Sequence, residues 1–294
     1  MSTNEMVLGT GFAHRLTRFF IYGALVLMAA MYLFPLFVVL MTSLKSAEEI
    51  RTGTIIDLPS APSLKSWYDA MFVACIGVSC NGLSKHFINS FTMVTPAVLL
   101  STSIGALNGF ALTQFRFRGD TLVFAFLLFG VFLPLQIVLI PLASVLGKIG
   151  IANSIWALVL VHVIYGIPFT TLFFRNFFVT VPHEITSAAK MDGAGFLQIF
   201  FRIVLPISIP SFVVSIIWQF TNIWNDYLFA TTYTSGDSSP VTVGLYNMVA
   251  STTGVKAYNV DMAAVLLTAL PTLIVYIFAG RYFIRGLVAG AVKG

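Results

Sequence analysis

The residues of this 294-residue chain that are able to do chemistry are few, and none is arranged for catalysis. The four histidines show no metal-ligand spacing, and no serine stands in the Gly-x-Ser-x-Gly arrangement of a hydrolase. A phosphate-binding loop is also missing, because the single Gly-Lys pair, Gly147-Lys148, is followed by isoleucine. We therefore expect that the chain is not an enzyme and holds no cofactor or metal of its own.

Amide side chains and an indole gather near residue 220 at helical spacing. Gln219, Asn222 and Asp226 follow one another at intervals of three and four, with Trp218 and Asn225 beside them. A sugar presents hydroxyl groups and an apolar ring face, which amides and an indole suit. The same residue types also form hydrogen bonds between packed membrane helices. Trp218, Gln219, Asn222 and Asn225 are thus either part of a substrate pathway or helix–helix contacts.

Two ionisable residues near this group are expected to have structural roles. His162 fits a packed core histidine better than a proton relay, since it stands alone in an apolar segment. Asp226 lies at the end of an apolar segment, where a buried carboxylate would be costly. We expect it to cap a helix or contact a loop.

The segment 175–206 is mixed in character and reads as helix, turn and helix. Pro182 suits the first turn of a helix, where no N–H is needed, and Glu184 suits the positive end of the helix dipole. Residues 185–191 are compatible with a helix, and Gly193 offers the left-handed position that ends one. Such a loop indicates a docking element for a soluble partner. The alternative is an interfacial helix that only anchors the neighbouring spans.

The composition places these residues in a membrane protein. Asp, Glu, Lys and Arg make up 9% of the chain, hydrophobic residues make up 58%, and the mean hydropathy is +0.93. Soluble domains carry about 25% charged residues. The composition therefore excludes a soluble enzyme, a disordered protein and a disulfide-rich secreted domain. The net charge of +5 does not indicate nucleic acid, because the basic residues are scattered singly.

Six apolar segments are long enough to cross a bilayer, which takes about 20 residues. They run from Phe19 to Met41, Phe87 to Leu112, Leu122 to Leu146, Asn153 to Phe174, Ile207 to Thr231 and Met262 to Tyr282. The first is too long for a signal-peptide core and has no clear cleavage site, so we interpret it as an uncleaved span. The expected fold class is all-α: a polytopic membrane protein with six transmembrane helices.

Six spans put both termini on the same side of the membrane. If this side also holds the 113–121 turn and the 175–205 segment, it has ten basic and four acidic residues, and the other side has a net charge of −1. The positive-inside rule then places both termini in the cytoplasm. The expected division is a cytoplasmic segment 1–18, a membrane domain 19–285 with outer loops 44–83 and 233–260 and the inner loop 175–206, and a cytoplasmic tail 286–294.

The two cysteines, Cys75 and Cys80, lie in the outer loop 44–83, which faces an oxidising compartment in this topology. A six-residue disulfide ring competes with two free thiols. We expect free thiols, because a spacing of five gives no special proximity.

The spacing within 182–206 resembles the EAA motif of ABC importer permeases, which is Glu-Ala-Ala, three residues, Gly, nine residues, then Ile-x-Leu-Pro. The residues that carry the resemblance are Pro182, Glu184, Ala188, Ala189, Asp192, Gly193, Ala194, Ile203, Leu205 and Pro206. Ser187 stands where the motif has glutamate, which leaves open whether the loop forms an ion pair with its partner there. With Trp224-Asn225-Asp226, Leu270-Pro271 and the ending Arg285-Gly286 to Lys293-Gly294, the chain resembles the second permease subunit of maltose-type sugar transporters over nearly its whole length.

This resemblance implies a type I permease subunit of an ATP-driven sugar importer in the bacterial inner membrane. Loop 175–206 would hold the coupling helix, which rests in a cleft on the ATPase. The implied coupling residues are Glu184, Ser187, Ala188, Ala189, Asp192, Gly193 and Ala194. The implied partners are a second permease subunit in a heterodimer, two ATPase subunits that bind ATP and Mg, and an extracytoplasmic sugar-binding protein. The outer loops would meet that protein, unless they are plain solvated connectors.

A rival hypothesis is a secondary transporter of a small solute that is driven by an ion gradient. It would need ionisable residues in mid-span and, often, an internal repeat, and the sequence shows almost no mid-span acids and no repeat. A purely structural membrane scaffold would leave the loop motif unexplained. The sequence does not specify which sugar is carried.

Overall fold

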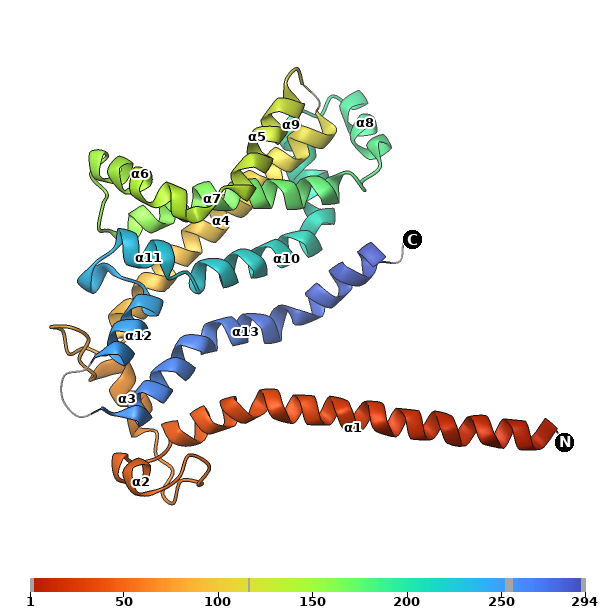
Figure 1. Cartoon of the computed structure of the whole chain (residues 1–294). Coiled ribbons are helices and arrows are strands. Elements are labelled where there is room, and N and C mark those ends of the chain that lie inside the picture. Colours follow the sequence, from red (N-terminus) through yellow and green to blue (C-terminus); the bar gives the residue numbers. More distant parts are fainter. Residues whose placement is uncertain (1–2, 116, 252–255, 292–294) are drawn as a thin grey trace. The chain divides into compact units, whose positions relative to one another are not determined.

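The computed structural model describes residues 3–115, 117–251 and 256–291, and it is helical almost throughout (Figure 1). The helices are α1 (Thr3–Ser43), α2 (Ala47–Thr52), α3 (Lys65–Phe72), α4 (Ser84–Gln114), α5 (Asp120–Phe132), α6 (Leu135–Lys148), α7 (Ile155–Phe178), α8 (His183–Met191), α9 (Phe196–Ile199), the π-helix η1 (Phe200–Val204), α10 (Leu205–Trp224), α11 (Leu228–Tyr233), the 3₁₀ turn η2 (Gly236–Ser238), α12 (Val241–Ala250) and α13 (Tyr258–Ala291). Among the described residues no strand occurs, and one isolated bridge pairs Ile76 with Ser79. The predicted all-α class is confirmed.

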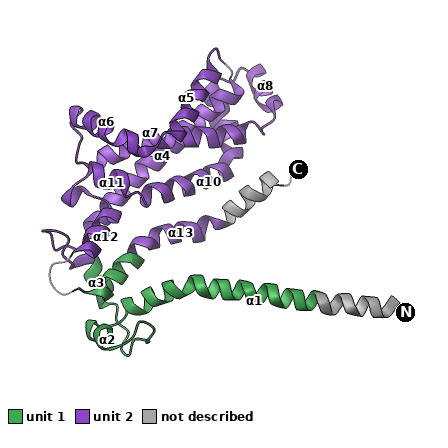
Figure 2. Ribbon diagram, in the orientation of Figure 1, with its two compact units in different colours: residues 1–70, 253–266 green, residues 71–252, 267–294 purple. Residues whose placement is uncertain are grey.

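The chain divides into two units (Figure 2). The first comprises residues 1–70 and 253–266, and the second comprises residues 71–252 and 267–294. In the first unit, α2 begins with a capping box in which Ser46 and Glu49 each accept a hydrogen bond from the other's backbone N–H. Hydrogen bonds from the Ser60 hydroxyl, and then from the Ser46 and Ser60 N–H groups, lower the pKa of Glu49 to about 2. The segment from Ser46 to Ser60 is therefore folded locally around an ionised carboxylate.

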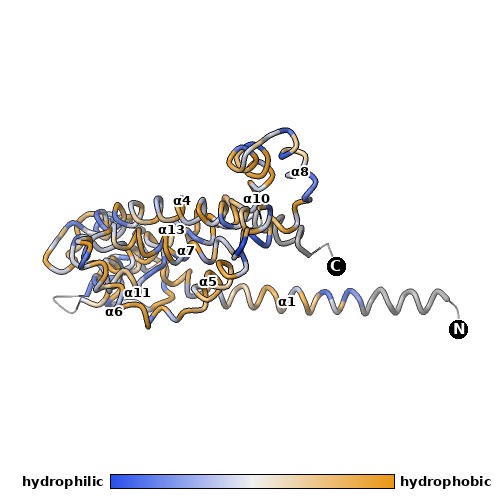
Figure 3. Tube along the Cα trace, turned by 90° about the horizontal axis from the view of Figure 1, so that it is seen from above, coloured by the Kyte–Doolittle hydropathy of each residue, from blue (hydrophilic) through white to orange (hydrophobic). Residues whose placement is uncertain are grey.

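Among the residues that the structure describes, five helices are long and apolar enough to cross a membrane, and the count rises to six if the bent pair α5 and α6 is one span. Hydrophobic residues dominate these helices in Figure 3. The five are His14–Ser43, Ser84–Gln114, Ile155–Phe178, Phe196–Trp224 and Tyr258–Gly280. The first, second, fourth and sixth predicted spans are confirmed with shifted ends.

The predicted third span, from Leu122 to Leu146, is not one straight helix. The segment is broken between α5 and α6, and the two helices meet at an angle of 102°. Leu133 and Pro134 at the break have ψ angles of 124° and 125°, which is extended backbone. Proline has no N–H to donate and disfavours the helical conformation of the residue before it. The break therefore follows from Pro134.

The fifth span also ends earlier than predicted, at Trp224 instead of Thr231. Asp226 then accepts hydrogen bonds from the N–H groups of Phe229 (3.3 Å) and Ala230 (3.0 Å), which lie in the first turn of α11. The carboxylate thus starts a new helix after the span. This confirms the expected capping role of Asp226.

In the second unit, α4, α7 and α10 pack against one another. Small residues at intervals of four, Ser101, Gly105 and Gly109, line the contact that α4 makes with α7. A Cβ atom added at Gly105 would lie 2.0 Å from Oγ1 of Thr170, and one added at Gly166 would lie 2.3 Å from a side-chain nitrogen of α10. Small residues let helix backbones approach closely in a membrane. This three-helix frame supports the segment from α8 to η1.

Candidate functional site

The loop between α7 and α10 contains the separate helix that the sequence predicts. α8 follows Pro182 and has Asp192 as its C-cap, and Gly193 adopts a left-handed φ of +80°. The N–H of Gly193 donates to the carbonyl of Lys190, and the N–H of Ala194 donates to the carbonyl of Ala189, both at 3.0 Å. These are the two hydrogen bonds of a Schellman turn. The predicted helix with its glycine turn is confirmed.

The residues of α8 divide between an outer and an inner face. The exposed residues of the helix include Glu184, Ser187, Ala188 and Met191, and Asp192 and Gly193 just after it are exposed as well. Met191 is 84% exposed, although its side chain is apolar. Ala189 belongs to the inner face, where it is buried, and Ala194 is half-buried against the same core. Of the seven residues that the motif singles out, five therefore lie at the surface and two help to seat the helix.

An aromatic core lies beneath α8. The ring of Phe110 in α4 has its centroid 5.0 Å from that of Phe196, 5.5 Å from that of Phe200 and 6.0 Å from that of Phe178. Ala189 packs into this core. The ends of α4 and α7 and the start of the next span thus form one packed base for the loop helix. Close packing of this kind transmits displacement, because protein interiors are dense and hardly compressible.

A polar joint adds to this base. The buried side chain of Gln114, the last residue of α4, accepts a hydrogen bond from Thr186 Oγ1 (2.9 Å) and donates one to the carbonyl of Phe178 (3.3 Å). Lys190 Nζ donates to the main-chain carbonyl of Gln114 at 3.0 Å and lies 3.8 Å from the ring centroid of Phe115. No local sequence pattern distinguishes Gln114, so the sequence analysis missed it.

The amides near residue 220 separate onto two faces of α10. Trp218, Asn222 and Asn225 lie exposed, and the indole of Trp218 stacks on Phe169 with a centroid distance of 5.1 Å. Gln219 is buried, and its Nε2 donates to Ser101 Oγ in α4 at 2.9 Å. Gln219 therefore does not share the exposed face of Asn222, although the two are three positions apart. Gln219 is a helix–helix contact, and the other three lie exposed.

His162 is buried, as expected of a core histidine. Its Nε2 lies 3.4 Å from Asp226 Oδ2, and its ring meets that of Phe229 edge to face. The pair links the middle of α7 to the start of α11. Local sequence patterns do not predict this pairing, because 64 positions separate the two residues.

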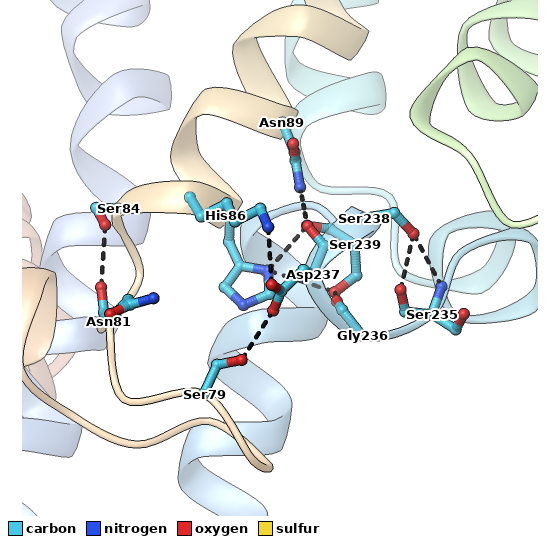
Figure 4. Close-up of polar contacts among 11 residues, drawn as sticks. Ser79, Asn81, Ser84, His86, Asn89, Ser235, Gly236, Asp237, Ser238 and Ser239 are labelled. Atoms are coloured by element: carbon cyan, nitrogen blue, oxygen red, sulfur yellow. Dashed lines mark hydrogen bonds and ion pairs between the residues drawn. The ribbon is translucent and has the colours of Figure 1, made fainter.

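The loop around Asp237 is held in place by the N-terminal part of α4 (Figure 4). His86 Nδ1 donates to the carbonyl of Ser239 at 2.8 Å, and Asn89 donates to the carbonyls of Asp237 (2.8 Å) and Ser239 (3.0 Å). Hydrogen bonds from Lys85 (2.7 Å) and then Ser79 (3.1 Å) lower the pKa of Asp237. Residues 235–239 are therefore fixed and are not a plain connector.

Cys75 and Cys80 form a disulfide, so the expectation of free thiols is wrong. Ile76 and Ser79 exchange both backbone hydrogen bonds (2.7 and 3.2 Å) around a two-residue turn at Gly77, which has a φ of +63°. The cysteines are the next opposed pair of this hairpin, with Cα atoms 3.8 Å apart. A spacing of five thus does give proximity when the four residues between form such a turn.

Reduction is expected to be required before either thiol reacts. These are the two cysteines of the chain, so the protein unfolded without reductant should add no maleimide, and after reduction it should add two, by mass spectrometry. The Cys75→Ser variant is the positive control, because its single unpaired thiol should add one label without reductant. Two labels on the unreduced parent chain would contradict the disulfide.

These features define a class: a multi-pass membrane protein whose spans support a separate loop helix on a packed base, as in transport permeases. The comparisons with known proteins agree. The chain belongs to the family of binding-protein-dependent transport system inner membrane components, which it matches over residues 97–287.

Individual relatives cover nearly the whole chain. It is 39% identical to a probable ABC transporter permease protein of Pyrococcus horikoshii, over 95% of this chain and 98% of that protein. It is 33% identical to the xylose/arabinose import permease protein XacI of Haloferax volcanii, over 90% of each. A chain of a bacterial ABC transporter involved in the import of the acidic polysaccharide alginate has the same fold, with a TM-score of 0.73 at 19% identity over 96% of this chain and 99% of that one. The chain is therefore the membrane permease subunit of an ABC transporter.

Proposed function

We propose that this chain forms half of the translocation pathway of an ATP-driven sugar importer, with both termini in the cytoplasm. The observation that carries the proposal is α8, a separate helix that is seated on a packed base and presents an exposed face to a soluble partner. The relative named for xylose and arabinose import supports a carbohydrate as cargo.

The exposed face of α8 would rest in a cleft on the ATPase. Glu184, Ser187, Ala188 and Asp192 would contact that cleft, Gly193 would set the end of the helix, and Ala189 and Ala194 would hold it on its base. Serine at position 187 brings no carboxylate to this contact. The exposed apolar side chains of Ile185 and Met191 would then supply more of the binding energy.

The remaining parts of the transporter would come from other chains. Two ATPase subunits would bind ATP and Mg, since this chain has no phosphate loop. A second permease would complete a heterodimer, and an extracytoplasmic sugar-binding protein would dock on the outer loops. Nucleotide binding shifts such an assembly between inward-open and outward-open states only by its differential affinity for the two. The contact with α8 must therefore differ between these states.

Purification of the tagged chain in mild detergent tests the proposal. A phosphate-loop ATPase and a second permease are expected to copurify, and uptake of sugar by proteoliposomes that hold the complex is expected to require Mg-ATP. Recovery of the chain alone, together with uptake that follows an ion gradient, would support the secondary transporter instead.

The exposed face of α10 is the proposed point of contact with the sugar. Trp218 and Asn222 lie one helical turn apart there, next to Asn225. The Trp218→Ala variant should raise the sugar concentration that gives half-maximal uptake by about 2- to 12-fold, since an aromatic contact is worth about 0.5–1.5 kcal/mol. Trp156→Ala removes an indole that is also exposed, at the start of α7, and is the matched control. Equal effects of the two substitutions would argue against the pathway.

A further inference from the structure

Gln114 connects three helices through one residue. Its side chain joins the end of α4 to Thr186 in α8 and to the end of α7 at Phe178, while its main-chain carbonyl receives Lys190 of α8. Gln114 is 6% exposed and Thr186 is 1% exposed. Every polar group of the glutamine side chain therefore meets its partner away from water.

The orientation of the amide follows from these partners. The carbonyl of Phe178 is able only to accept, so the group that faces it must be the NH₂ of Gln114, and the side-chain oxygen then faces the hydroxyl of Thr186. Exchanging the oxygen and the NH₂ group of the side chain would place the side-chain carbonyl against the carbonyl of Phe178. The amide of Gln114 thus has one orientation, which distinguishes it from the apolar contacts around it, and the hydroxyl of Thr186 also lies 3.0 Å from the carbonyl of His183 in its own helix.

Directional bonds constrain movement in a way that apolar packing does not. The apolar contact of Ala189 with the aromatic core fixes no bond direction, because hydrophobic and dispersion attraction are non-directional. A buried hydrogen bond weakens steeply once its angle or length changes, and a buried polar group without a partner is costly. If α8 moves, α4 and α7 either follow it or lose these bonds.

We propose that Gln114 is a positioning residue through which a displacement of α8 is passed to α4 and α7. The inference rests on the proposed function, because it assumes that an ATPase moves α8. The side chain is remote from the exposed face of α8, so its removal leaves the docking surface intact. Loss of Gln114 should therefore separate ATP hydrolysis from transport instead of abolishing both.

The experiment is to measure sugar uptake and ATP hydrolysis in the same proteoliposomes, with the complete transporter and its binding protein. Gln114→Met keeps the length of the side chain and removes its hydrogen bonds. We expect the ATPase to remain bound and active, and the amount of sugar moved per ATP to fall about tenfold, within the range of measured coupling between sites. Thr186→Val should also lower the amount of sugar moved per ATP. Thr186→Ser, which keeps the hydroxyl, should retain the value of the parent transporter.

Thr113→Val is the matched control. Thr113 is also buried, one position earlier, but its hydroxyl donates only to Gly109 and Phe110 of its own helix. An unchanged sugar-to-ATP ratio in Gln114→Met, or an equal fall in Thr113→Val, would overturn the inference. If Gln114→Met does not fold, the comparison of Thr186→Val with Thr186→Ser decides by the same ratio. A parent complex that takes up sugar without ATP would instead overturn the proposed function, and this inference with it.

Discussion

Gly193→Val is expected to abolish ATP-driven uptake while the chain still inserts into the membrane and folds. The φ of +80° at Gly193 lies in the left-handed region, where a β-branched L-residue is a conformational outlier. A Cβ atom there would meet nothing within 4 Å, so crowding does not add to the cost. The penalty of about 1–2 kcal/mol falls on the backbone alone and acts on the Schellman turn that ends α8. Uptake into proteoliposomes, with protein yield as a check, measures the result.

The neighbouring glycine provides the control for this variant. Gly195 also has open space around its Cβ position, but its φ is −78°, which every L-residue adopts. Gly195→Val should therefore retain uptake. Gly193→Asn should retain more activity than Gly193→Val, because asparagine tolerates the left-handed conformation best among residues other than glycine. Normal uptake by a well-expressed Gly193→Val variant would remove the central argument for α8 as the coupling element.

The features that the sequence predicts correctly depend on neighbours along the chain. Pro182 and Gly193 mark the ends of α8 because capping and left-handed turns are local events. Apolar runs locate the spans for the same reason. Pro134 shows the limit of locating spans by apolar runs. The hydropathy of 122–146 is continuous, so it reports the length of the segment but not that the helix changes direction within it. Whether a proline bends a span or breaks it depends on what the two halves pack against.

The features that the sequence analysis missed depend on contacts between distant segments. Gln219 and Asn222 have similar side chains, yet one is buried against Ser101 and the other is exposed. Helical spacing places them about 60° apart at best and does not say which face meets another helix. The pairing of Cys75 with Cys80 required the intervening turn to be identified. One available signal was overlooked, namely the run of small residues at intervals of four from Ser101 to Gly109.

That run leads to the prediction with the largest effect on folding. Gly105→Leu is expected to prevent stable packing of α4 against α7. The smaller substitution Gly105→Ala tests how closely the two helices approach each other. The added Cβ atom would lie 2.5 Å from Cβ and 2.9 Å from the carbonyl carbon of Thr170, so a side-chain rotation is not enough and the helices must separate. Overpacking of this kind costs about 1–3 kcal/mol. The melting temperature of Gly105→Ala should therefore fall by several degrees. Size-exclusion chromatography of samples heated to increasing temperatures measures this.

A helical glycine with free space separates crowding from the general effect of losing a glycine. Nothing lies within 4 Å of a Cβ atom added at Gly147 in α6, so Gly147→Ala should leave the melting temperature unchanged or raise it, because alanine is the better helix former. Thr170→Gly removes the side-chain atoms that crowd position 105 and should recover part of the loss in Gly105→Ala. If Gly105→Ala has the same melting temperature as the parent chain, α4 and α7 are not as close as the structure places them. Gly105 and Gly193 thus differ in what a substitution would change: Gly105 lets α4 and α7 pack closely, whereas Gly193 ends the helix through which, in the proposed function, that frame responds to a partner.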